Sequence, residues 1–176
     1  QGPDAGKVLV GGVFSTYNGT PVNNLVRLTQ MGTIDPTFSI GTGPNSAVNE
    51  IVIEPDGDVV IGGLFTSFNG TPRSRIARVN SAGTLDPAFV PVLDDTVLAI
   101  ALEPDGRMIV GGGFNSLGGT GVPALPGQST GPITNVSGIL RFDSSGVLDP
   151  TFPIGTGVND LIYDILVQGD RRILIV

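Results

Sequence analysis

The residues of this 176-residue chain with the clearest chemical potential are arginines and aspartates that recur at one spacing. Three times, an aspartate follows an arginine by eight residues, and each arginine lies in an apolar stretch. An unpaired charge is costly to bury, so we expect each arginine to pair with the aspartate of its own repeat. A site for an anionic ligand is the less favoured alternative. The pairs are Arg27 and Asp35, Arg78 and Asp86, and Arg141 and Asp149.

The three aspartates share the context Ile/Leu-Asp-Pro. One interpretation is a ring of carboxylates that binds calcium or a sugar. The other is a turn, because an aspartate before a proline caps backbone N–H groups and starts a bend. One carboxylate per repeat lies too far from the next to share an ion, unless all three line a central channel. We therefore expect the turn.

Two further acidic stretches resemble calcium loops, Asp56-Gly57-Asp58 and Asp94-Asp95. A calcium loop of the EF-hand type needs acidic residues at alternate positions and a bidentate glutamate at its end, and neither stretch has them. We therefore expect no cofactor, with a structural calcium ion as the alternative.

The composition excludes several kinds of chemistry. The chain has no histidine and no cysteine, which excludes Cys/His zinc sites, a Ser-His-Asp triad and a Cys-His dyad. A glycosidase would need two carboxylates about 5–10 Å apart, and the sequence places no such pair. We therefore expect no enzymatic activity. A net charge of −7 argues against nucleic acid as a partner. The sequence has no apolar run of about eighteen residues, so we expect no membrane insertion.

The elements that position these residues belong to an internal repeat. A Gly-Gly-x-Phe element, the arginine strand, the Asp-Pro turn and an alternating strand recur in this order, about fifty residues apart. The predicted repeat units of this one array are 4–55, 56–104 and 105–169, with a partial unit 170–176. The recurring structural positions are Gly12, Phe14, Arg27, Asp35, Phe38, Gly63, Phe65, Arg78, Asp86, Phe89, Gly112, Phe114, Arg141, Asp149 and Phe152.

Each unit offers four short strand candidates separated by turn residues such as Pro-Asp-Gly and Asn-Gly. The Gly-Gly pair suits a strand that neighbouring blades approach closely, and the following phenylalanine is expected to pack between blades. No stretch shows the periodicity of a helix. The sequence therefore predicts an all-β, β-propeller-type array of four-stranded antiparallel blades, with three full repeats and one strand of a fourth.

The third unit carries an insertion near 118–138, rich in Gly, Pro, Ser and Thr. Binding residues often lie on loops held by a rigid scaffold, so this insertion is the first place to expect an individual function. A tolerated surface insertion is nevertheless the favoured interpretation. Asn18, Asn69 and Asn135 begin glycosylation sequons, although in the first two an Asn-Gly turn explains the same residues.

The stretch "PDGDVVIGGLF…RIARVNSAGTLDPAF" resembles the delta-sixty repeat of bacterial and phage β-propeller-like proteins. The resemblance covers nearly the whole chain and lies in the order and spacing of the elements. Met31-Gly32 and Ala82-Gly83 depart from the Asp-Gly of that repeat. The resemblance implies a large, secreted, cell-surface or virion protein without family-wide catalytic residues.

Two functions follow as expectations. The leading one is a non-catalytic structural or interaction module that contacts a protein partner, or further blades or copies of itself. The alternative is a carbohydrate-binding or glycan-processing propeller that contacts a surface glycan. A closed propeller needs about four to eight blades, so we expect this chain to be a segment of a longer array or to be completed by another copy.

Overall fold

The structure is a computed structural model that describes residues 6–118, 133–134, 136, 138–153 and 157–176. Every element that it assigns in these residues is a β-strand. The first nine are β1 (Val8–Gly11), β2 (Thr16–Tyr17), β3 (Thr20–Pro21), β4 (Leu25–Leu28), β5 (Val48–Ile53), β6 (Val59–Gly63), β7 (Ser67–Phe68), β8 (Thr71–Pro72) and β9 (Ile76–Val79). The others are β10 (Val92–Leu93), β11 (Val97–Leu102), β12 (Met108–Gly112), β13 (Ser116–Gly118), β14 (Ile133–Thr134), β15 (Ile139–Phe142), β16 (Ile165–Val167) and β17 (Ile173–Ile175).

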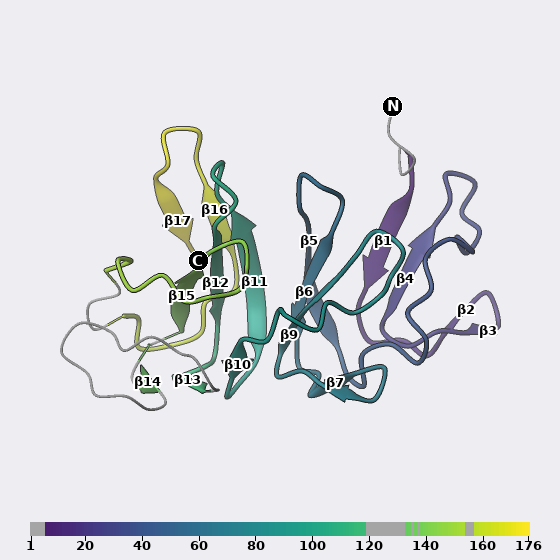
Figure 1. The fold of residues 1–176 in the computed structure, drawn as a ribbon, viewed down its shortest axis with the longest axis horizontal. Helices are drawn as coiled ribbons and strands as arrows, with labels where there is room; N and C mark the ends of the chain where they lie inside the picture. Colours follow the sequence, from purple (N-terminus) through teal and green to yellow (C-terminus); the bar gives the residue numbers. More distant parts are fainter. Residues whose placement is uncertain (1–5, 119–132, 135, 137, 154–156) are drawn as a thin grey trace.

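Four antiparallel sheets follow one another along the chain: β1–β4, β5–β6–β9, β11–β12–β15 and β16–β17. Figure 1 shows the first three in sequence order across the long axis, from β1 and β4 on the right to β11, β12 and β15 on the left, where β16 and β17 overlap the third sheet in this view. The sheets are offset by one strand from the sequence repeats. The strand that closes one sequence unit, such as β5, pairs with the first strand of the next unit, β6.

Small hairpins lie along one rim of the sheets, at the bottom of Figure 1. β2 pairs with β3 through Asn18-Gly19, and β7 pairs with β8 through Asn69-Gly70. Both residues of each turn have positive φ, as a type I′ hairpin requires. In the third repeat β13 pairs with β10 and β14 instead. The Asn-Gly turns expected from the sequence are therefore present.

The expected fourth strand of each blade is reduced to a single bridge. Ile34, Leu85 and Leu148 each form an isolated antiparallel bridge with the arginine strand of their own repeat. The next backbone N–H, that of the Asp-Pro aspartate, donates to the arginine carbonyl, and the proline after it has no N–H to extend the ladder. Within the described residues the second and third sheets have three strands and a one-residue fourth contact, and the first and fourth sheets have two strands, which corrects the four-stranded expectation.

The core lies between consecutive sheets. One buried cluster joins the first two sheets, a second joins β6 and β9 to the third sheet, and another joins the third sheet to β16. The first glycine of each Gly-Gly pair makes this packing possible. A Cβ on Gly62 would lie 2.4 Å from Val97 Cγ1 in the next sheet, and one on Gly111 would lie 2.6 Å from Ile162 Cγ2. The expected close approach of blades at these glycines is confirmed, although the described sheets do not form a closed ring.

Candidate functional site: the Arg–Asp–Phe clusters

Each of the first three sheets carries an Arg–Asp–Phe cluster, which we define as the arginine, the aspartate eight residues later and the phenylalanine three residues after that. The strand–turn–bridge geometry places the first two side chains together. Arg27 Nε lies 2.8 Å from Asp35 Oδ2, Arg78 Nη2 lies 2.6 Å from Asp86 Oδ2, and Arg141 Nε lies 2.9 Å from Asp149 Oδ2. The arginine–aspartate pairing expected from the spacing is therefore present in all three repeats.

The phenylalanine of each cluster lies under the guanidinium. The distance from the arginine Cζ to the ring centroid is 4.6 Å for Phe38, 4.9 Å for Phe89 and 4.8 Å for Phe152. These distances are those of a cation–π contact. The guanidinium thus lies between a carboxylate and an aromatic face. Its Nη1 group takes no part in these hydrogen bonds to the aspartate and can contact another residue.

The Nη1 group of two arginines reaches the following repeat. Arg27 Nη1 donates to the carbonyl oxygen of Ser81 at 2.7 Å, and Arg78 Nη1 donates to the carbonyl oxygen of Ser144. Ser81 and Ser144 occupy the same position in the turn that follows the arginine strand. The cluster is therefore a contact between repeats as well as a pair within one repeat.

The carboxylates of the clusters are held in the charged form. Burial raises the pKa of Asp35, but hydrogen bonds from the Thr37 hydroxyl and N–H, with Lys7 and Arg27, outweigh it and keep this pKa well below its usual range. The Thr151 hydroxyl is the largest influence on Asp149, and with Arg141 it lowers this pKa to about 2 against the effect of burial. An ionised carboxylate beside each arginine is what a structural ion pair requires.

A second cation joins two of the clusters. Lys7 Nζ lies 3.0 Å from Asp35 Oδ2, and Arg107 Nη1 lies 3.2 Å from Asp149 Oδ2. The second repeat has Asp58 at this position instead. Burial is the largest cause that raises the pKa of Asp58, and Asp56 and Asp86 add to it, while Arg78 opposes it. The middle cluster therefore carries an acidic residue where its neighbours carry a basic one.

The two acidic stretches considered as calcium loops differ in their surroundings. Glu54, Asp56 and Asp58 each offer a carboxylate oxygen within 4.8 Å of the others, and Arg78 Nη1 lies 3.5 Å from Glu54 Oε2. Asp94 instead accepts the backbone N–H groups of Asn115 and Ser116 through one oxygen. Asp94 is thus a turn cap, and only the first stretch gathers carboxylates.

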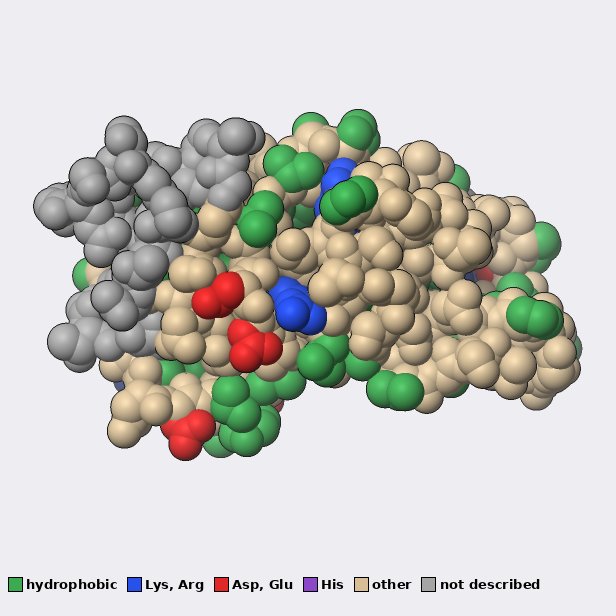
Figure 2. Space-filling model, turned by 90° about the horizontal axis from the view of Figure 1, so that it is seen from below, with side chains coloured by type: hydrophobic (Ala, Val, Ile, Leu, Met, Phe, Trp, Pro, Cys, Tyr) green, Lys and Arg blue, Asp and Glu red, His purple; other side chains and the backbone are tan. Residues whose placement is uncertain are grey.

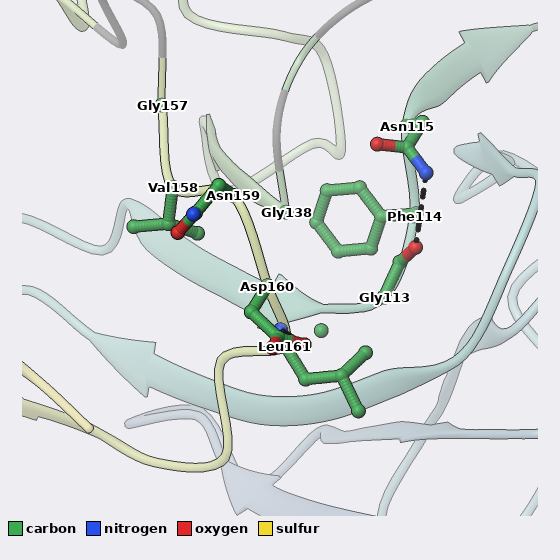
Figure 3. Close-up of a pocket in the computed structure, with 10 residues that line it drawn as sticks. Gly113, Phe114, Asn115, Gly138, Gly157, Val158, Asn159, Asp160 and Leu161 are labelled. Atoms are coloured by element: carbon green, nitrogen blue, oxygen red, sulfur yellow. Dashed lines mark hydrogen bonds between the residues drawn. The ribbon is translucent and has the colours of Figure 1, made fainter.

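One pocket, with a cavity volume of about 540 Å³, lies beside the base of the insertion. Figure 3 shows the end of β12 with residues 113–115 on one side and the segment 157–161 on the other. Asn115, Asn159 and Asp160 bring two amides and one carboxylate to the lining, and Asp160 Oδ1 accepts the N–H of Leu161 at 2.8 Å. Amide and carboxylate groups suit a hydroxyl-bearing ligand, but no second carboxylate belongs to the described lining.

The small hairpins form a face with few charges. Figure 2 shows this rim, on which basic and acidic side chains are few and most of the described surface is backbone or uncharged side chain. Most of the insertion, including the sequon residue Asn135, lies outside the described residues. Its expected binding role therefore stays a prediction.

Sequence reasoning missed three features of the site. Lys7 and Arg107 align two or three residues after a Pro-Asp, so a position-by-position alignment of charges could have found the second cation. The Thr37 and Thr151 hydroxyls follow from the Asp-Pro-Thr turn. The reach of Nη1 into the next repeat has no local signal, because its partners lie 54 and 66 residues away.

Comparison with known proteins places these features in context. A family model described as "Domain of unknown function (DUF5122) beta-propeller" matches residues 6–38, 54–89 and 103–125, just over half of the chain. The matched segments contain the first two Arg–Asp–Phe clusters in full. No curated protein matches the sequence.

Among solved structures, the extracellular domain of a one-component system protein from B. thetaiotaomicron is similar to this chain. It has 12% sequence identity and a TM-score of 0.36. The match covers 98% of this chain and 25% of that one, so the chain spans a quarter of the neighbour's length. Within the described residues, no helix has the length and apolarity needed to cross a membrane.

Proposed function

Because the chain belongs to the family of the domain of unknown function (DUF5122) beta-propeller, we propose that it is a non-catalytic repeat scaffold that makes protein–protein or surface contacts. The observation that carries this proposal is the donation by Arg27 and Arg78 to the turn of the following repeat. The most distinctive polar residues of the repeat are thereby used to hold the array together.

The chemistry of the described residues supports the same proposal. The arginines and aspartates of the three clusters are paired with one another. The lining of the pocket contains a single carboxylate, that of Asp160. The partners that we propose are proteins, including further repeats or copies of this chain. A secreted, cell-surface or virion location is proposed with them, and it rests on the resemblance to the delta-sixty repeat.

A carbohydrate-binding module is the second candidate, and the pocket at Asn115, Asn159 and Asp160 favours it. The amides and the carboxylate supply hydrogen-bond donors and acceptors for sugar hydroxyls, and Leu161 and Val158 add apolar surface.

A glycan array, together with a hydrolysis screen on a panel of glycosides, separates the two candidates. The scaffold proposal predicts neither turnover nor glycan binding that depends on Asp160. Binding that is lost in Asp160→Asn, but kept in the distant surface variant Asp170→Asn, would replace the scaffold by the carbohydrate-binding module. Turnover with the same dependence would make the chain an enzyme.

A further inference from the structure

The residue directly before β4, β9 and β15 occupies the same backbone position in each repeat. Its carbonyl oxygen accepts a hydrogen bond from the second glycine of the Gly-Gly pair, and its N–H donates to the carbonyl oxygen of the phenylalanine that lies two residues after that glycine. The φ angle is positive at all three positions. The equivalent residues are Asn24, Arg75 and Gly138. Two repeats therefore carry a polar side chain at a position where the third has none.

In the first repeat this side chain reaches the segment that leads into the next sheet. Asn24 Nδ2 donates to the carbonyl oxygen of Pro44 at 3.0 Å. The residue of the third repeat that aligns with Pro44 is Val158. A Cβ on Gly138 would lie 3.5 Å from Val158 Cγ2, so a side chain there would point toward the equivalent segment. The glycine leaves this space without a side chain of its own.

A second glycine of the third repeat replaces a larger residue beside the first. Arg75 Nη1 donates to the carbonyl oxygen of Leu64 at 2.5 Å. Gly113 aligns with Leu64 and with Val13 of the first repeat. Both Gly113 and Gly138 line the pocket of about 540 Å³, and Figure 3 shows them in its wall. The pocket thus lies where the third repeat lacks two side chains that the other repeats have.

The pocket offers hydrogen-bond acceptors that have few partners. The carbonyl oxygen of Gly113, which corresponds to the acceptor of Arg75, receives one long hydrogen bond of 3.5 Å from Asn115 Nδ2 (Figure 3). Asp160 Oδ1 accepts the N–H of Leu161 at 2.8 Å, whereas no donor among the described residues binds Asp160 Oδ2. A guanidinium has five N–H donors and no acceptor, so its hydrogen-bonding capacity matches these groups.

We propose that this pocket binds the guanidinium of an arginine side chain that belongs to a protein partner. The guanidinium donates to the Gly113 carbonyl oxygen, as Arg75 donates to that of Leu64, and to the free oxygen of Asp160. The methylene groups of the arginine pack on Val158 and Leu161, which line the pocket. The net charge of −7 favours the approach of a basic partner.

The inference rests on the proposed scaffold function, and it names the group through which a protein partner is recognised. Its test is a nuclear magnetic resonance titration of the 18.0 kDa chain, labelled with nitrogen-15, with Nα-acetyl-L-arginine methylamide. We expect shifts of the backbone N–H signals of residues 113–115, 138 and 157–161, with a Kd on the order of 1 mM for so small a ligand. The citrulline analogue has the same shape without the charge, so it should bind at least about tenfold more weakly.

Two variants locate the binding. Asp160→Asn removes the carboxylate and should weaken binding about tenfold, because a hydrogen bond between two charged groups is lost. Asp56→Asn is its matched control, since Asp56 is exposed in the turn between β5 and β6 and the change in net charge is the same. Gly113→Leu restores the residue of the second repeat. Its Cβ would approach Leu161 Cδ2, at 2.8 Å, which is the end of a flexible side chain, so we expect a folded chain with a filled pocket and no binding.

The proposal would be overturned if the arginine derivative caused no shifts at ten times the expected Kd, or if it shifted signals away from the pocket. Equal affinity for the citrulline analogue would overturn it, as would unchanged binding by Asp160→Asn or by folded Gly113→Leu. These results leave the scaffold function standing, because that function depends on the contacts that Arg27 and Arg78 make between repeats.

Discussion

At the scale of single residues, each Arg–Asp–Phe cluster joins a guanidinium, a carboxylate and an aromatic ring whose individual contributions are modest. Arg27 and Asp35 are almost fully buried, at 5% and 3% exposure, so their charges depend on each other and on the surrounding hydrogen bonds. Removing one partner of such a pair costs far more than the pair contributes, because a buried charge is left uncompensated. The clusters are therefore sensitive points of the fold.

A basic residue at position 58, where the other two clusters have a second cation, should stabilise the middle cluster. In Asp58→Lys the new ammonium would face Asp86, as Lys7 faces Asp35, and the acidic neighbour would be gone. Partly exposed ion pairs contribute little, so we expect a gain of about 0.5 kcal/mol in the free energy of unfolding, measured with urea. Thr20→Lys, at the exposed β2–β3 hairpin, is the control that should change little. Destabilisation by Asp58→Lys would contradict this interpretation of the position.

The third cluster should lose stability in acid. The pKa of Asp149 is lowered to about 2 in the folded chain, so its ionised form stabilises the fold fully above the ordinary value of 3.8. This contribution is lost as the pH falls from about 4 to about 2. We expect Asp149→Asn to cost roughly 1–2 kcal/mol at neutral pH and the difference from wild type to shrink over that range. A difference that is independent of pH would show that the charge plays no part.

The pairing of Arg27 with Asp35 could be predicted from the sequence, because the chain reverses in a short turn between them and brings the two residues side by side. The contact from Arg27 to Ser81 could not be predicted, since it depends on how one sheet packs on the next. The cluster of Glu54, Asp56 and Asp58 was underestimated for a different reason: only the Asp56-Gly57-Asp58 stretch was considered, and Glu54, which directly follows β5, adds the third carboxylate.

At the scale of elements, the close packing of successive sheets depends on the first glycine of each Gly-Gly pair. Gly62 lies in the fully buried strand β6 and faces Val97 and Ile100 of the next sheet. Its neighbour Gly63 faces backbone, with a Cβ position 2.0 Å from the carbonyl oxygen of Ala47. A side chain at Gly62 would therefore collide with side chains of the next sheet, whereas a side chain at Gly63 would collide with backbone atoms.

We expect Gly62→Ala to cost about 1–3 kcal/mol, because a methyl group at this position overpacks the interface between two sheets. The obstructing atoms belong to side chains, so Val97→Ala in the same molecule should recover part of the loss. Gly169→Ala, whose Cβ would meet nothing within 4 Å, is the control. Equal effects of Gly62→Ala and Gly169→Ala in urea unfolding would contradict the packing account.

The strand pattern was predictable where residues alternate or where β-branched residues gather, as in β5 and β6, and the Asn-Gly hairpins followed from turn chemistry. The fourth strand was not. Around Asp35, Pro36 removes a donor, and the aspartate uses its carboxylate for Arg27, so the segment turns away after one bridge. Local β-propensity therefore overestimated the strand length of this segment, because its aspartate binds Arg27 and its proline has no N–H to donate to a neighbouring strand.

At the scale of the whole molecule, the chain is a row of sheets whose cores and polar clusters both lie between neighbours. In such arrays stability is approximately a sum of the stabilities of the repeats and of nearest-neighbour interfaces. An arginine that contacts the next repeat contributes to the interface. Its loss should therefore weaken the following repeat as well as its own.

The most direct measurement is native-state hydrogen exchange of Arg78→Lys against the wild type. The lysine keeps a charge near Asp86 but loses the fork that also reaches the Ser144 carbonyl, so we expect a loss of about 1–3 kcal/mol. The account predicts faster exchange in β15 and in its turn at 143–146 as well as in β9, with Arg75→Lys as the control. Faster exchange confined to β9 and its own turn would contradict the claim that the cluster couples consecutive repeats.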